Sequence, residues 1–203
     1  MAIGSTILDA LRRLANRVFR REEDARVRAM AELLDEIPLF RPLPRGMLLD
    51  LAAAFHERSY RKDEFLYYEG DPGIGLYVVQ SGNVRLLVED PEGTTHEICE
   101  VGPNEILGAT CLLGGGVIKR TESAQATVPT QVLGLFSPEF RTLQRRHPKT
   151  GAAVATLLAR HFAQRLTETR KLLIEESGSI ETATWLAQAA RSAAEHADPP
   201  PGW

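Results

Sequence analysis

Residues 107–112 read Leu-Gly-Ala-Thr-Cys-Leu, and Arg120-Thr121 follows shortly after them, in the middle of a pattern of short strands separated by glycine-containing turns. A turn that opens a short helix presents backbone N–H groups that can bind an anion. One arginine on the buried side can hold the same anion with two parallel hydrogen bonds. The stretch therefore predicts a compact binding site for a single phosphate group.

The segment around this stretch, from about residue 56 to residue 136, consists of short strand-like runs with turn signals between them. The strand-like runs lie at 65–68, 76–79, 84–88, 97–101 and 130–135, and the turn signals at 69–73, 81–83 and 90–93. Many short strands at regular spacing favour an antiparallel barrel or jelly roll. The expected fold class is α+β, mainly β: a jelly-roll-like antiparallel β-barrel flanked by N-terminal helices and a long C-terminal helix.

Helical patterns flank the barrel segment on both sides. Before it, apolar residues recur at helical spacing between residues 3 and 18, opposite a row of arginines, and a short helix is expected over 47–55. After it, Pro138 and Pro148 suit the first turns of helices. A long helix is expected from Pro148 to about residue 176, ended by Gly178, and a last short helix over 180–197.

These patterns predict four segments along the chain. They are an N-terminal amphipathic helical segment (1–32), the barrel with its preceding helices and a short helix (33–147), a long helix (148–177), and a short C-terminal helix with a tail (178–203).

Composition narrows the class of protein. With 203 residues, 43% of them hydrophobic and 25% charged, the chain is typical of a soluble globular protein, and it shows no apolar run long enough to span a membrane. Two cysteines are too few for a disulfide framework, so a cytoplasmic location is expected. A net charge of −3 disfavours nucleic-acid binding by electrostatics alone. Residues 1–21 nevertheless carry five arginines and one aspartate.

Catalysis is not expected. The five histidines are scattered without a His-x-His pair, which disfavours a metal-dependent barrel enzyme. The chain has no nucleophile elbow, Walker loop or dinucleotide fingerprint. We therefore predict no catalytic residue, no metal ligand and no cofactor.

Several motifs in fixed order resemble the cyclic-nucleotide-binding domain family. They are Leu-x-x-Ile-Pro-Leu-Phe-x-x-Leu-Pro at 34–44, Tyr-Glu-Gly-Asp at 68–71, Leu-Tyr-Val-Val-x-x-Gly-x-Val at 76–84, Ile-Leu-Gly at 106–108, and Arg120-Thr121. The last two resemble the start and the end of the family's phosphate-binding cassette, so we call residues 106–121 the cassette. The resemblance extends from about residue 33 to residue 173 and is to the catabolite-activator-like effector domain, without the DNA-binding domain.

The resemblance implies a ligand and a binding site. The ligand would be a cyclic mononucleotide, cyclic AMP (cAMP) or cyclic GMP (cGMP), whose phosphate is held by Arg120 and by the N–H groups of the short helix after Gly108. A glutamate that binds the ribose 2′-hydroxyl in the family is replaced here by Ala109. Loss of this acceptor costs about 1–3 kcal/mol, unless Thr110 or Glu105 substitutes for it. The implied ligand-binding residues are Gly108, Ala109, Thr110, Arg120, Thr121, Thr169 and Arg170.

The long helix has two interpretations. Apolar residues fall on one stripe of it, which is typical of core packing. The same stripe could pair with its twin in a homodimer. The resemblance also makes this helix a lid over the base, with Thr169 and Arg170 near the purine. Thr169 could equally be a small residue of a helix interface, and Thr121 does not distinguish cAMP from cGMP.

We therefore expect a stand-alone sensor or adaptor that binds a cyclic mononucleotide and signals to a partner protein. The alternative is a degenerate fold that acts as a ligand-independent protein-interaction scaffold; Ala109 favours the scaffold and Arg120 the receptor. Direct DNA binding is not expected, because the residues after 176 cannot supply a recognition helix and wing. The N-terminal helix over residues 3–21 is expected to be an ordinary surface helix, with docking on a membrane surface or a partner as the alternative.

Overall fold

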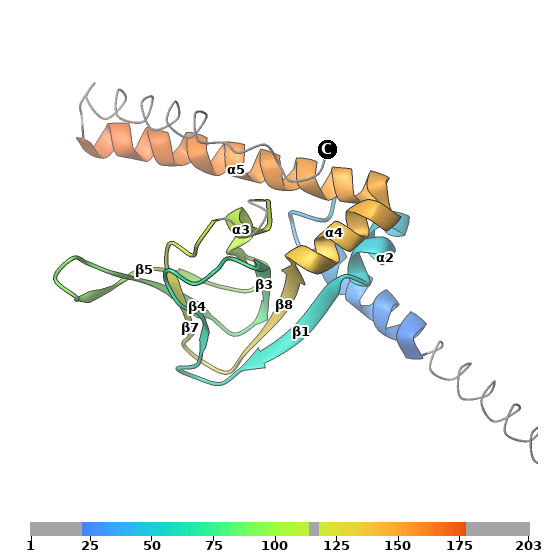
Figure 1. The fold of residues 1–203 in the computed structure, drawn as a ribbon, viewed down its shortest axis with the longest axis horizontal. Coiled ribbons are helices and arrows are strands. Elements are labelled where there is room, and N and C mark those ends of the chain that lie inside the picture. Colours follow the sequence, from blue (N-terminus) through green and yellow to red (C-terminus); the bar gives the residue numbers. More distant parts are fainter. Residues whose placement is uncertain (1–21, 114–117, 178–203) are drawn as a thin grey trace, which may run out of the picture. The chain divides into compact units, whose positions relative to one another are not determined.

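The computed structural model describes residues 22–113 and 118–177 (Figure 1). The chain divides into two compact units, Met1–Ala153 and Val154–Trp203. The first unit contains the strands and the helices up to the start of α5 (Pro148–Ser177), and the second contains the rest of α5. The helices predicted over residues 3–18 and 180–197 lie outside the described residues.

Two antiparallel four-stranded sheets form the core of the first unit. One has the order β1 (Phe55–Tyr60), β8 (Thr130–Phe136), β3 (Gly75–Ser81), β6 (Ile106–Leu107). The other has the order β2 (Phe65–Tyr67), β7 (Ser123–Ala126), β4 (Val84–Glu89), β5 (Thr95–Val101). The expected jelly-roll-like fold is confirmed, and the inward faces of both sheets meet in one apolar cluster.

The side chains inside the barrel follow the two-residue period of the strands. In β7, Ala124 and Ala126 are fully buried in the cluster, whereas Gln125 lies between them on the opposite face and bonds Arg85. Tyr67 and Tyr77 enter the same interior from the two sheets, with their ring centroids 6.1 Å apart. The interior therefore combines aromatic rings with small alanine side chains.

Helices cover one end of the barrel. Residues 22–36 are helical, and α2 (Arg45–Ala52) follows after a run of turns. The helix predicted over 47–55 is corrected at its end: α2 stops at Ala52, and Phe55 begins β1 opposite Leu135. Phe55 is completely buried and packs edge-on against Phe40, so tertiary packing overrides the continued helix.

Two helices follow β8. Helix α4 (Ser137–Arg146) has Pro138 in its first turn, and α5 begins at Pro148, as predicted. A Cβ on Gly151 would lie 2.8 Å from the Cα of Gln144, so only glycine permits the close approach of α5 to α4. Asp50 of α2 accepts a hydrogen bond from the Thr150 hydroxyl (2.8 Å), and its other carboxylate oxygen lies 3.1 Å from Nδ1 of His147, which ties the start of α5 to α2.

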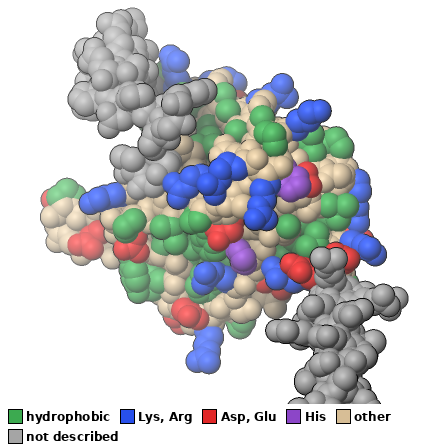
Figure 2. Space-filling view, turned by 45° about the vertical axis from the view of Figure 1, so that its right-hand side comes forward, with side chains coloured by type: hydrophobic (Ala, Val, Ile, Leu, Met, Phe, Trp, Pro, Cys, Tyr) green, Lys and Arg blue, Asp and Glu red, His purple; other side chains and the backbone are tan. Residues whose placement is uncertain are grey.

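The long helix, considered by itself, changes character along its length. On the predicted stripe, which runs from Leu158 to Leu173, Leu158 is fully buried, but Leu166 is 60% exposed and Leu173 is 41% exposed. Core packing therefore accounts for the first turns of the predicted stripe and not for its later residues. Within the described ranges, no helix has the length and apolar character needed to cross a membrane. Figure 2 shows basic, acidic and apolar side chains interspersed on the face that it presents.

Candidate functional site

Backbone hydrogen bonds fix the position of Arg120 at the end of the cassette, just before β7. Its N–H donates to Asp71 O, and its carbonyl accepts from Gly70 N, both at 2.9 Å. The turn at 69–73 thus holds Arg120 in an extended backbone conformation, reinforced by the bridge between Pro72 and Lys119. Because side chains alternate along this segment, Arg120 is directed to the same interior as Ala124 and Ala126.

The Arg120 side chain lies inside the barrel and is only 3% exposed. Its Nη1 donates to Gly108 O at 3.1 Å, and its Nη2 donates to Gly75 O at 2.8 Å. The guanidinium carbon lies 4.0 Å from the centroid of the Tyr67 ring and 5.8 Å from that of Tyr77. Carbonyl dipoles and aromatic faces therefore surround the positive charge.

No carboxylate forms an ion pair with this charge within the described part of the chain. None of the ion pairs there includes Arg120, and its buried Nε–H has no hydrogen-bond partner. Burying a charge without a counter-ion costs several kcal/mol, which carbonyls and aromatic rings offset only in part. The site is therefore electrostatically suited to an anion.

Gly108 makes room for the guanidinium. Its φ is +67°, and a Cβ at this position would lie 1.8 Å from Nη1 of Arg120. Only glycine satisfies both the left-handed backbone and the close contact. The short helix α3 (Ala109–Leu113) follows at once, with Ala109 buried and Thr110 exposed. Gly108 and Arg120 thus lie in direct contact, and Ala109 follows Gly108 in the chain.

Neither residue considered as a replacement for the missing glutamate is oriented by a bond toward Ala109. One carboxylate oxygen of Glu105 accepts from Gly102 N at 2.7 Å, so this side chain closes its own turn. The Thr110 hydroxyl lies 3.9 Å from the Sγ of Cys111. The structure therefore offers no hydroxyl acceptor at position 109 itself.

A second polar group beside Arg120 was missed from sequence. Glu122 accepts one hydrogen bond from the Tyr67 hydroxyl, at 3.2 Å, and another from the Thr121 hydroxyl. Burial raises the pKa of Tyr67, and the negative charge of Glu122 raises it further, against the opposing effect of Arg120. Tyr67 therefore stays protonated, with its ring against the guanidinium and its hydroxyl on Glu122.

Two of the predicted binding residues belong to the long helix and not to the barrel. Thr169 and Arg170 are exposed residues of α5 and belong to the second unit. Their role near a base stays a prediction. The residues that sequence reasoning missed are Gly75, Tyr67, Tyr77 and Glu122. The strand alternation of β2 and β3 was the available signal for the tyrosines.

Comparison with known proteins places the chain in a family. Residues 57–147 match the family described as Cyclic nucleotide-binding domain. The Cyclic AMP receptor protein of Thermus thermophilus is 36% identical over 140 residues, which are 67% of this chain and 64% of that protein. Residues 57–147 therefore form a domain of the cyclic-nucleotide-binding domain family. The chain spans less than two thirds of the length of the curated relatives it matches.

Solved structures agree with the assignment. The crystal structure of the N-terminal domain of a transcriptional regulator from Streptomyces coelicolor A3(2) has 31% sequence identity and a TM-score of 0.57, over 70% of this chain and 94% of that one. A cyclic nucleotide-binding domain from Methylobacillus flagellatus has 24% identity and a TM-score of 0.63, over 75% and 85% of the two chains. The similarity to the Methylobacillus domain supports the fold alone.

Proposed function

We propose that this chain is a regulatory protein that binds a cyclic mononucleotide, cAMP or cGMP, at Arg120 and signals to a partner protein. The observation that carries the proposal is the buried Arg120 guanidinium, which has an unpartnered Nε–H and no carboxylate ion-pair partner in the described chain. The Thermus relative, whose name states that it is a cyclic AMP receptor, supports this ligand class.

The charge and the donors of Arg120 suit a cyclic phosphodiester. A guanidinium has five N–H donors, and the carbonyls of Gly75 and Gly108 take two of them. The remaining donors include the buried Nε–H, which can bond a phosphate oxygen in a charge-assisted geometry. A cyclic phosphodiester carries a single negative charge, which neutralises the single positive charge of the guanidinium.

Ala109 favours the second candidate function, a scaffold that binds partner proteins without a ligand. A buried sugar hydroxyl left without its acceptor costs about 1–3 kcal/mol, or roughly tenfold to a hundredfold in affinity. We propose that this loss weakens nucleotide binding without abolishing it, because the phosphate contacts of Arg120 do not depend on position 109.

Signal output would pass through α5. Ligand binding at Arg120 would order the cassette, and a different affinity for two positions of α5 would shift their populations. Leu166 and Leu173, which are exposed and lie on the same face of α5, suit pairing with a second copy of the chain or with a partner protein. We further propose a cytoplasmic regulatory role without catalysis and without direct DNA contact. A membrane role for residues 3–21 falls outside the described residues.

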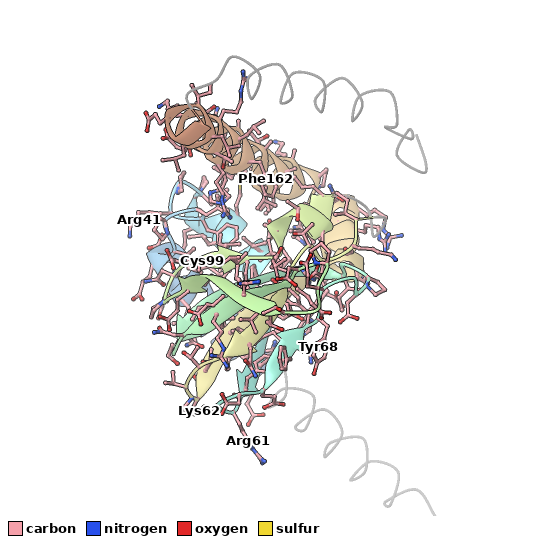
Figure 3. All side chains as sticks on the ribbon, turned by 90° about the vertical axis from the view of Figure 1, so that its left-hand side faces the viewer. Arg41, Arg61, Lys62, Tyr68, Cys99 and Phe162 are labelled. Carbon is pink, nitrogen blue, oxygen red and sulfur yellow. The ribbon has the colours of Figure 1, made fainter. Side chains whose placement is uncertain are left out.

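Titration calorimetry with cAMP and cGMP tests the receptor directly. The wild type should release or absorb heat with at least one nucleotide, and Arg120→Ala should abolish the signal. Arg120→Lys keeps the charge but loses the paired donors, so it should weaken binding and provides a second variant if alanine impairs folding. Arg41→Ala is the matched control, because the Arg41 side chain projects from the surface and donates to the Glu36 carbonyl (Figure 3). If neither nucleotide gives heat at millimolar concentration, the ligand-independent scaffold is the function that remains.

A further inference from the structure

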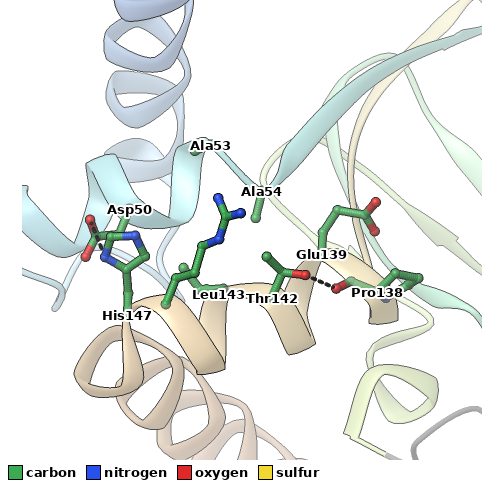
Figure 4. A pocket seen from close by; sticks show the side chains of 9 residues that line it. Asp50, Ala53, Ala54, Pro138, Glu139, Thr142, Leu143 and His147 are labelled. Atoms are coloured by element: carbon green, nitrogen blue, oxygen red, sulfur yellow. Dashed lines mark hydrogen bonds and ion pairs between the residues drawn. The ribbon is translucent and has the colours of Figure 1, made fainter.

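A pocket of about 350 Å³ lies between α2 and α4 in the first unit (Figure 4). We call it the α2–α4 groove. It is lined by Asp50, Ala53, Ala54, Pro138, Glu139, Thr142, Leu143, Arg146 and His147. None of the residues around Arg120 lines it, so the groove is a site separate from the one at Arg120.

The lining residues of α4 lie on one face of the helix. Positions 139, 142, 143 and 146 are spaced by three and four residues, which brings them into a single stripe. Glu139 stands in the first turn of α4 and Arg146 in the last, about 10 Å apart at 1.5 Å per residue. The groove thus has Glu139 at one end, Arg146 beside Asp50 and His147 at the other, and an apolar middle formed by Leu143 and Ala54, both buried.

The charged residues that line the groove differ in whether they already have partners. The Asp50 carboxylate accepts a hydrogen bond from Thr150 and contacts His147 within ion-pair distance, so it already has partners within the chain. The Oε2 of Glu139, in contrast, is buried and has no hydrogen-bond partner. Arg146 is exposed and takes part in none of the ion pairs between described residues. The helix dipole favours an acid in the first turn and a base in the last, but it leaves the buried oxygen unsatisfied.

We propose that the α2–α4 groove binds a small zwitterion of the amino-acid type, with an ammonium group on Glu139 and a carboxylate on Arg146. A short aliphatic chain between these groups would pack on Leu143 and Ala54. The ammonium supplies the N–H donors that the buried Glu139 oxygen lacks, and the guanidinium binds a carboxylate through paired hydrogen bonds.

The test uses 4-aminobutanoate as the probe, with the whole chain labelled for two-dimensional NMR. Adding the probe should shift backbone amides on both walls of the groove, at 50–54 and 138–147, and leave those at 105–125 unchanged. Glu139→Gln and Arg146→Gln should each weaken binding by about tenfold or more, the usual effect of losing a charged hydrogen bond. Glu57→Gln is the matched control on exposed β1, outside the groove.

Two single-charge analogues make the test discriminating. Butylamine and butanoate should each bind more weakly than the zwitterion, because each satisfies only one end of the groove. Absence of amide shifts at millimolar 4-aminobutanoate would overturn the proposal. So would equal binding of butylamine, or binding that is indifferent to Glu139→Gln. All these outcomes are independent of whether a cyclic nucleotide binds at Arg120.

Discussion

Replacing Gly108 by alanine should displace the Arg120 guanidinium from its position between the carbonyls of Gly75 and Gly108. The new Cβ would lie 1.8 Å from Nη1 and 2.9 Å from Cζ of Arg120, at a φ of +67°. The left-handed backbone alone costs about 1–2 kcal/mol for alanine. Moving the guanidinium forfeits two hydrogen bonds from a charged donor, for a further loss of about 2–4 kcal/mol. We expect the free energy of unfolding to fall by about 3–6 kcal/mol in total, a large part of the usual stability of a domain.

Urea unfolding of a small set of variants measures the two contributions separately. Gly70 also has a positive φ, +80°, but nothing lies within 4 Å of the place that a Cβ would occupy there, so Gly70→Ala should show the backbone cost alone. In an Arg120→Ala background, Gly108→Ala should likewise cost only about 1–2 kcal/mol. If Gly108→Ala costs no more than Gly70→Ala, or costs the same with and without Arg120, the guanidinium does not occupy the place described here.

Three further predictions concern the rest of the chain. Tyr67→Phe removes the donor to Glu122 and should lower the free energy of unfolding in urea by about 1 kcal/mol; an unchanged value would contradict that contact. Burial raises the pKa of Tyr60 to about 12, above the ordinary value of 10.0, so its contribution to stability is complete below pH 10 and is lost as the pH rises from 10 to 12. The free energy of unfolding, measured from pH 9 upward, should show this fall, and a rise would refute the assignment. Leu166→Asp with Leu173→Asp should turn a dimer into a monomer in light scattering, and a wild-type monomer would exclude pairing through α5.

The barrel was largely predictable from sequence because its turns and its apolar strands carry strong local signals. The five predicted runs correspond to β2, β3, β4, β5 and β8. Strands β1, β6 and β7 were missed. Strand β7 reads Ser-Ala-Gln-Ala, without a β-branched or aromatic residue, and forms because Ala124 and Ala126 fit beneath large neighbours inside the barrel. That reason exists only in the folded chain.

The candidate site was predictable only in part. The position of Arg120 at the end of the cassette and the need for glycine at 108 follow from motif order and turn chemistry. The carbonyl of Gly75 and the ring of Tyr67 come from other strands, far away in sequence, and reach Arg120 only through the sheet pairing. Glu122 has the sequence character of an ordinary strand-end charge, and only the fold brings the Tyr67 hydroxyl to it.

The central claim is that the buried guanidinium of Arg120 receives the phosphate of a cyclic mononucleotide. The most direct measurement is the ¹H–¹⁵N spectrum of the arginine Nε–H groups during addition of cAMP or cGMP. One signal, absent from the Arg120→Lys variant, should shift as its unpartnered Nε–H gains a phosphate oxygen. If that signal stays in place while either nucleotide saturates the protein, the nucleotide binds elsewhere and the claim is wrong.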